Sequence, residues 1–208
     1  MSHATTAAEH VETAPAPLSP RRRQLLGAAL HVITDEGLKG LTHRAVDRRA
    51  GLAEGSCSAY WRTRSALEAA LTEYVAATLL CDVDRLAEQI RDCGPDETTG
   101  VDEALELFLR WLDQRELLVA RLELTMAASR DDELAQLLAD HRSRLVGIVE
   151  DIMTAAGKEH GAARAEALVA SYDGVLLAAL LKPVEERRAF LSRSLELLGT
   201  SLADAGTS

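Results

Sequence analysis

The chain has 208 residues and a formal net charge of −10, with 47% hydrophobic residues. This apolar content supports a folded core, and no apolar run approaches the roughly 20 residues that a membrane span needs. Three cysteines, Cys57, Cys81 and Cys93, lack C-x-x-C spacing, which argues against a disulfide scaffold or a structural zinc site. The first 20 residues have no signal-peptide pattern, so we expect a cytoplasmic protein.

The charge is distributed unevenly along the chain. Residues 18–67 carry nine Lys and Arg against four Asp and Glu, a net charge of +5, whereas the rest of the chain is strongly acidic. A basic unit attached to an acidic body is typical of a module that binds a polyanion such as DNA. The alternative is chance, since an imbalance of this size in 50 residues is not rare.

Cap residues mark the first predicted helices. Ser19 suits an N-cap, and apolar residues then recur at helical spacing up to a stop at Gly37. Thr42 and Thr63 are predicted to cap two further helices. Residues 1–18 are rich in Ala, Thr, Glu and Pro without periodicity, which predicts a disordered tail. The helices predicted in this part are 20–36, 42–50, 54–60 and 64–90.

The remaining sequence is helical in pattern almost to its end. Residues 93–100 are rich in turn formers and predict a loop, and Gly157 and Gly161 bracket a second loop. Pro183 separates the last two helices. No segment has the pattern of a strand, so the predicted fold class is all-α. The helices predicted here are 101–112, 117–128, 132–156, 162–181 and 185–202.

Residues 42–60 have the pattern of a helix-turn-helix. Gly51 permits the sharp reversal that lays a second helix across the first. The second helix then begins with small residues at positions 55, 56, 58 and 59, which would let it approach base edges in the major groove. The alternative is a plain antiparallel helical hairpin, which length and glycine placement alone do not exclude.

Several linked positions in residues 21–71 occur in ungapped register: Ala28-Ala29, Gly37, Leu41-Thr42, Gly51-Leu52, Gly55-Ser56, Trp61, Arg64 and Leu67. With these positions the stretch resembles the DNA-binding domain of the tetracycline-repressor (TetR) family. Two positions depart from the family pattern. Ser58 stands where a tyrosine is usual, and Ala53 replaces the usual Ser or Thr cap, a change that removes roughly 1 kcal/mol of helix capping.

The resemblance implies a three-helix helix-turn-helix domain at residues 19–66 and a helical ligand-binding and dimerisation domain at 67–204. It also implies a homodimer, formed through the last two helices, that binds an inverted-repeat operator in double-stranded DNA. Arg21–Arg23 could also follow the minor groove or the DNA backbone. For this run and for His43, the alternative is an ordinary solvated surface without a role in DNA binding. The DNA-binding residues expected from the resemblance are Thr42, His43, Arg44, Gly55, Ser56, Ser58, Tyr60 and Arg64.

The family also encloses a small-molecule effector, whose binding lowers affinity for DNA. Polar groups embedded in the apolar C-terminal helices are the candidates for such a pocket, although each could instead be ordinary core or surface. The stretch 121–138, RLELTMAASRDDELAQLL, resembles the regulatory domain of actinobacterial members. The candidate ligand-binding residues are Trp111, Arg115, Arg121, Glu123, Thr125, Met126, His141 and Tyr172.

Catalysis has little support in the sequence. The motifs G-x-S-x-G, H-E-x-x-H and G-x-G-x-x-G are absent, and the histidines have no metal-ligand spacing. We therefore expect neither an enzyme, nor a cofactor, nor a metal site. The prediction is a ligand-responsive repressor. The alternative is an all-α dimer that binds a ligand or a protein without recognising an operator.

Overall fold

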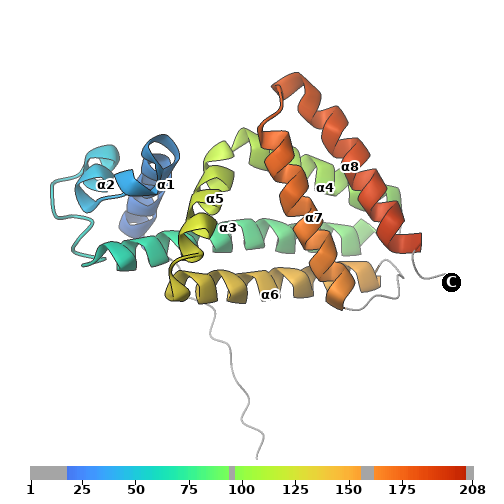
Figure 1. Cartoon of the computed structure of the whole chain (residues 1–208), viewed down its shortest axis with the longest axis horizontal. Helices are drawn as coiled ribbons and strands as arrows, with labels where there is room; N and C mark the ends of the chain where they lie inside the picture. Colours follow the sequence, from blue (N-terminus) through green and yellow to red (C-terminus); the bar gives the residue numbers. More distant parts are fainter. Residues whose placement is uncertain (1–17, 94–96, 156–161, 205–208) are drawn as a thin grey trace, which may run out of the picture.

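The computed structural model describes residues 18–93, 97–155 and 162–204. Within these ranges the chain forms eight α-helices and no β-strand, which confirms the all-α prediction. Figure 1 shows α1 and α2 at one end of the long helix α3, which continues into the larger body. The helices are α1 (Pro20–Gly40), α2 (His43–Ala50), α3 (Arg64–Cys93), α4 (Glu97–Asp113), α5 (Arg115–Ala128), α6 (Asp132–Ala155), α7 (Ala162–Leu180) and α8 (Val184–Asp204).

Side-chain caps begin the helices where the sequence predicted them. The hydroxyls of Ser19, Thr42 and Thr63 each accept a hydrogen bond from the backbone N–H three residues later, at 3.3, 3.2 and 3.1 Å. Each cap satisfies one of the N–H groups that a helix start leaves without an internal partner. Gly37, at φ 69°, interrupts the helical backbone of α1, as its predicted role as a stop requires.

Residues 54–60, which we name the recognition segment, differ from the prediction. They form hydrogen-bonded turns rather than an α-helix. The N–H of Ala59 donates to the carbonyl of Gly55 at 3.1 Å, and that of Trp61 donates to Cys57 at 3.0 Å, so single helical bonds remain. Gly55 has φ 94°, which is incompatible with a continuous helix, and this explains why the turns do not propagate.

The boundary of the predicted loop 93–100 is also wrong. Helix α4 begins at Glu97, so residues 97–100 are helical. The sequence DETTG looks like a loop because of its turn formers, but acidic and hydroxyl residues also suit the first turn of a helix. The predicted tail up to residue 17, residues 94–96, and the loop bracketed by Gly157 and Gly161 lie outside the described residues.

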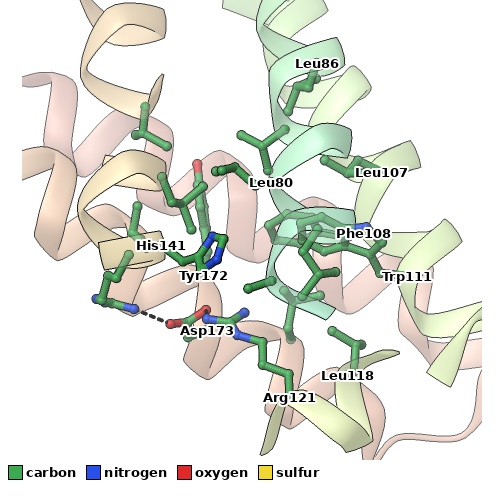
Figure 2. Close-up of a pocket in the computed structure, with 18 of the residues that line it drawn as sticks. Leu80, Leu86, Leu107, Phe108, Trp111, Leu118, Arg121, His141, Tyr172 and Asp173 are labelled. Carbon is green, nitrogen blue, oxygen red and sulfur yellow. Dashed lines mark hydrogen bonds and ion pairs between the residues drawn. The ribbon is translucent and has the colours of Figure 1, made fainter. Parts of the chain in front are cut away.

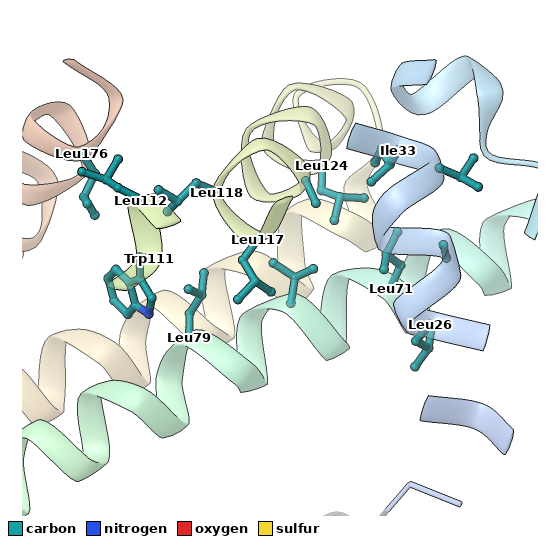
Figure 3. Packing of buried hydrophobic residues seen from close by; sticks show 14 of the residues in the cluster. Leu26, Ile33, Leu71, Leu79, Trp111, Leu112, Leu117, Leu118, Leu124 and Leu176 are labelled. Carbon is teal, nitrogen blue, oxygen red and sulfur yellow. The ribbon is translucent and has the colours of Figure 1, made fainter. Parts of the chain in front are cut away.

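One buried cluster connects the N-terminal helices to the body. Figure 3 shows Leu26 and Ile33 of α1 near Leu71 of α3, followed along α3 by Leu79 and then by Trp111. Helix α1 packs against α5 as well as α3, and α6 packs along α3. A shift of α5 therefore bears directly on α1, because close-packed interiors transmit displacement. None of the described helices is sufficiently long and apolar for a membrane crossing.

Candidate DNA-binding surface and ligand cavity

The chain reverses direction directly after α2. Gly51 adopts φ 67° and ψ 32°, the left-handed conformation that commonly ends a helix and that glycine adopts without steric cost. Its N–H donates to the carbonyl of Arg48 at 3.2 Å, and the N–H of Leu52 donates to that of Asp47 at 2.9 Å. The predicted turn at Gly51 is therefore present.

A buried carboxylate holds the recognition segment against α2. Asp47 is 1% exposed. Its Oδ2 accepts a hydrogen bond from the N–H of Gly55 at 2.8 Å, and its Oδ1 accepts one from the N–H of Cys57 at 2.7 Å. The bond to Gly55 satisfies a backbone donor that a Ser or Thr cap at Ala53 could have addressed, and the bond to Cys57 satisfies a donor beyond the reach of such a cap. Asp47 thus replaces the lost cap from the neighbouring helix.

The thiol of Cys57 lies in the core beneath the recognition segment. Cys57 is fully buried, and burial, followed by the nearby charge of Asp47, raises the pKa of the thiol to about 11. A thiol with this pKa stays protonated at neutral pH and is a poor nucleophile. Cys57 is therefore a structural residue of the core beneath the recognition segment rather than a reactive thiol.

Exposed side chains of α2 and the recognition segment form one face. Arg44 is 83% exposed and lies 3.9 Å from Glu54, itself 80% exposed, so this ion pair is weak and screened by solvent. The hydroxyls of Ser56 and Ser58 donate to the carbonyls of Ala53 and Gly55 at 2.7 and 3.1 Å. Thr42 and Gly55 are exposed on this part of the chain, whereas Ser56 and Ser58 are half-buried.

Tyr60 joins this face to the start of α1. It is 39% exposed, and the guanidinium of Arg22 lies 5.4 Å from the centre of its ring, within cation–π range. The ring of Trp61 lies 5.8 Å from that of Tyr60, and Trp61 packs half-buried against the core. Trp61 therefore belongs to the edge of the core, and the Arg22 contact brings one residue of the Arg21–Arg23 run next to Tyr60.

Two expected DNA contacts already have partners inside the protein. His43 Nε2 donates to the carbonyl of Trp61 at 2.6 Å. Arg64 Nη2 donates to the carbonyl of Leu38 at 2.7 Å, and Arg64 Nε donates to Glu68 at 2.6 Å. Arg64 thus ties the start of α3 to the end of α1. A phosphate contact would have to use its remaining N–H groups.

A cavity of about 480 Å³ lies among α3, α4, α5, α6 and α7. Figure 2 shows apolar side chains over most of its wall, including Leu80, Leu86 and Leu107. Helix α5 contributes Leu118, Arg121, Leu122 and Thr125, which recur at the spacing of one helix face. The volume is within the range of sites that enclose a small organic ligand, roughly 300–1,000 Å³.

Charged groups gather at one place in the cavity wall. Asp173 of α7 accepts a hydrogen bond from Arg121 of α5 at 2.6 Å and another from Arg142 of α6 at 2.7 Å. All three side chains are half-buried. Figure 2 shows Arg121 and Asp173 converging from different helices. We refer to Arg121, Arg142 and Asp173 as the charge cluster.

His141 places an unpaired nitrogen beside the charge cluster. Its Nε2 lies 2.8 Å from a carboxylate oxygen of Glu73 and donates to it, whereas its buried Nδ1 has no hydrogen-bond partner. The imidazole points from α6 into the cavity in Figure 2. Buried polar atoms are normally paired, so an unpaired one in a cavity wall is a natural contact for a ligand.

Aromatic residues form another part of the wall. The rings of Phe108 and Trp111 stack at 5.6 Å, and Tyr172 meets Phe108 edge-on at 5.4 Å. Trp111 Nε1 donates to Asp82 at 2.9 Å, which fixes the indole. Burial raises the pKa of Tyr172 to about 12, so its phenol is neutral at physiological pH.

Five of the eight predicted ligand-binding residues line the cavity, and three do not. The lining residues are Trp111, Arg121, Thr125, His141 and Tyr172. Arg115 is exposed, and Met126 is 60% exposed, because both lie on faces of α5 that turn away from the cavity. Glu123 lies on a face of α5 that contacts α1 instead. Contact of the lining residues with a ligand stays a prediction.

Glu123 connects α5 to the end of α1. Its Oε2 accepts a hydrogen bond from the N–H of Leu38 at 3.2 Å, directly after the break at Gly37. One turn earlier in α1, Thr34 Oγ1 lies 3.4 Å from the carbonyl of Glu116. Helix α5 therefore lines the cavity with one face and holds the end of α1 with another.

The residues that the sequence analysis missed share one property: each bonds to a partner on another element, across a turn for Asp47 and on distant helices for Arg142 and Asp173. Asp47 looks like one of several charges on a short helix, and Arg142 is one of many arginines. Asp173 did carry a usable signal, because it is the only charged residue between Glu166 and Lys182 in an otherwise apolar stretch. A lone charge in an apolar helix usually has a buried partner or a functional role.

Comparison with known proteins identifies the family. The family model described as tetracyclin repressor-like, C-terminal domain, matches residues 95–199. A comparison with curated protein sequences gives no match. Among solved structures, the chain is similar to a transcriptional regulator from Rhodococcus sp. RHA1, with 20% identity, a TM-score of 0.74 and coverage of 87% of this chain and 95% of that one.

Two further structures extend the similarity. A TetR-family member from Streptomyces coelicolor A3 has 25% identity and a TM-score of 0.64, with coverage of 85% of this chain and 98% of that one. The multidrug-binding protein EbrR, solved with ethidium, has 26% identity and a TM-score of 0.60, with coverage of 84% and 98%. With its helix-turn-helix region and its matching C-terminal half, the chain belongs to the TetR family of transcriptional regulators.

Proposed function

We propose that the chain is a ligand-responsive repressor. As a homodimer it binds an inverted-repeat operator in double-stranded DNA, and a small-molecule effector in the cavity releases it. In this proposal residues 19–66 are the DNA-binding domain, and residues 67–204 are the ligand-binding and dimerisation domain. A DNA partner would also place the protein in the cytoplasm.

The observation that carries this proposal is the double role of α5. Leu118, Arg121 and Thr125 line the cavity, while Glu123 of the same helix bonds to Leu38 at the end of α1. A ligand that moves α5 would therefore move α1 and the DNA-binding face attached to it. Binding at either site then changes affinity at the other by the same factor.

The DNA-binding face has the charge and exposure that the proposal needs. Residues 18–67 carry a net charge of +5 on an otherwise acidic chain. The Arg44 side chain is 83% exposed, and Asp47 fixes the backbone of the recognition segment. Arginine recognises guanine through two parallel hydrogen bonds, so Arg44 is our choice for sequence reading.

Exposed apolar side chains on the last two helices support a homodimer. Leu181 after the end of α7, and Val184 and Leu197 of α8, are 81%, 69% and 60% exposed. Three large apolar residues exposed on α8 and at its junction with α7 are costly in water unless another surface covers them. A second copy packed as a four-helix bundle would cover them and would present two recognition segments to successive major grooves.

EbrR supports the effector part of the proposal. It is a multidrug-binding protein and was solved in complex with ethidium, so a protein of similar fold binds an organic molecule. The cavity of about 480 Å³ in this chain has room for a ligand of comparable kind. The chemistry of that ligand follows from the wall of the cavity itself.

Selection from a random duplex pool tests the proposal. The purified chain should enrich an inverted repeat at moderate salt, and Arg44→Ala should lose the enrichment and flatten the dependence of log affinity on log salt by about one unit. Arg144→Ala is the control, because Arg144 is exposed on α6 in the body. A folded dimer that enriches no sequence would instead favour the all-α module that binds a ligand or a protein without operator recognition.

A further inference from the structure

The wall of the cavity has an unusual charge balance. In the described part of the chain, its only permanently charged side chains are Arg121, Arg142 and Asp173, which sum to +1. The histidine in the wall, His141, adds no negative charge. Nearly all other lining residues are apolar. An effector that matches this wall is mostly apolar and carries one negative charge.

The cavity is also polarised along its length. Arg142 lies near the middle of α6, and Met153 lines the cavity near the end of the same helix. These positions are 11 residues apart, or roughly 16 Å at the rise of an α-helix. Beyond the charge cluster the wall consists of residues such as Leu86, Val149 and Val169. The polar group of an effector therefore belongs at one end and its apolar body at the other.

The charge cluster has donors left for an anion. Asp173 takes one N–H from each arginine. A guanidinium carries five N–H donors in a planar fork that matches a carboxylate. The unpaired Nδ1 of His141 adds another polar atom beside them.

A cationic effector fits this wall poorly. It would have to pair with Asp173, whose two oxygens are already bonded to Arg121 and Arg142. Displacing the arginines would leave two half-buried guanidiniums without their partner, which costs free energy. The similarity to a protein solved with ethidium therefore does not extend to the charge of the ligand.

We propose that the cavity selects an apolar effector with a single carboxylate, bound by Arg121 and Arg142, with its hydrocarbon body toward Leu86 and Val149. This inference rests on the proposed role of the cavity as an effector site. It goes beyond that role, because it assigns the chemical class of the effector. It can be tested without any operator.

Calorimetric titration of the full-length chain tests the assignment with three probes of equal chain length: decanoate, 1-decanol and decyltrimethylammonium. Decanoate should bind at least tenfold more tightly than the other two. Arg121→Met and Arg142→Met should each weaken decanoate at least tenfold, whereas Asp173→Asn, which raises the cluster charge to +2, should keep or strengthen binding. Arg144→Met, an exposed change on α6, should have no effect.

Three results would overturn the assignment in a folded chain: tighter binding of decyltrimethylammonium, no binding of decanoate, or decanoate binding that neither arginine variant weakens. Operator release is measured separately. If decyltrimethylammonium binds and releases operator DNA, the carboxylate assignment fails while the proposed function stands. If decanoate binds as expected but leaves operator binding unchanged, the cavity chemistry stands and the effector role fails.

Discussion

At the scale of single residues, the orientation of the proposed DNA-binding face depends on a buried carboxylate, that of Asp47. The recognition segment has no side-chain cap of its own at Ala53, and its hydroxyls bond back to nearby carbonyls. Its orientation therefore comes from Asp47, which holds the N–H groups of Gly55 and Cys57. Sequence spacing predicts contacts within one helix, so it does not reveal that Asp47 bonds to N–H groups on the other side of the turn.

Asp47→Asn should destabilise the fold and weaken DNA binding. Asparagine keeps one acceptor oxygen but turns its NH2 group toward the second N–H, which leaves a buried donor unpaired at a cost of about 1–3 kcal/mol. Urea unfolding measures the loss. Asp35→Asn is the control, since Asp35 pairs with Arg49 in a solvent-accessible position and its loss should cost little. Equal stability of the two variants would remove Asp47 from its capping role.

The cysteines should differ sharply in reactivity. Cys81 is exposed, whereas Cys57 is buried with its pKa raised to about 11. At pH 8 iodoacetamide should modify Cys81 and spare Cys57 until the chain is unfolded in urea. Because the pKa in the folded state lies above the ordinary thiol value of 9.0, the neutral thiol favours folding below about pH 9, and this contribution is lost as the pH rises through about 11. Peptide mapping of the labelled chain at each pH measures how fast each thiol reacts and at which pH the fold opens to expose Cys57. Rapid labelling of Cys57 in the native chain would contradict its burial.

At the scale of helices, local signals predicted what is local. The caps at Ser19, Thr42 and Thr63 and the stop at Gly37 need only a few neighbouring residues, and the structure has all four. The errors arose where one pattern has two meanings. The small residues of 54–60 suit a short helix, but Gly55 breaks it, and the turn formers before residue 101 also suit a helix start.

The cavity shows which features a local sequence pattern cannot predict. Polar residues in apolar helices pointed to five lining positions, yet the faces of α5 were not assigned correctly for Arg115, Glu123 and Met126. Which face meets α1 and which meets the cavity depends on the packing of α5 between them. The charge cluster joins three helices, and no local spacing indicates that Asp173 pairs with Arg121 and Arg142.

The contact between α5 and α1 should be measurable at a single amide. Glu123→Gln weakens the bond to the N–H of Leu38, because a neutral oxygen accepts less strongly than a carboxylate. Hydrogen exchange at Leu38 should therefore become faster, while the cavity on the other face of α5 keeps its ligand affinity. Glu133→Gln, at an exposed position at the start of α6, is the control. Unchanged exchange at Leu38 would mean that Glu123 does not hold the end of α1.

At the scale of the whole molecule, charge and apolar surface are separated in a way that suits an assembly. Residues 18–67, with a net charge of +5, lie at one end, and the rest of the chain is acidic. In the proposed repressor this acidic body would repel DNA from surfaces other than the DNA-binding one. The exposed apolar residues Leu181, Val184 and Leu197 lie on α8 and on its connection to α7, away from α1 and α2. A second copy bound there leaves both DNA-binding faces accessible.

Leu181→Glu should convert the proposed dimer into a monomer. Leu181 is 81% exposed in the single chain, so a carboxylate there should change the stability of the monomer little. In a dimer interface the same carboxylate would be buried without a partner, which costs free energy. Sedimentation should show the loss of the dimer, and affinity for an inverted repeat should fall steeply because each monomer holds only one half-site. Met126→Glu replaces another exposed apolar residue, 60% exposed on α5, and should remain dimeric. A dimer that survives Leu181→Glu would place the interface on another face of the body.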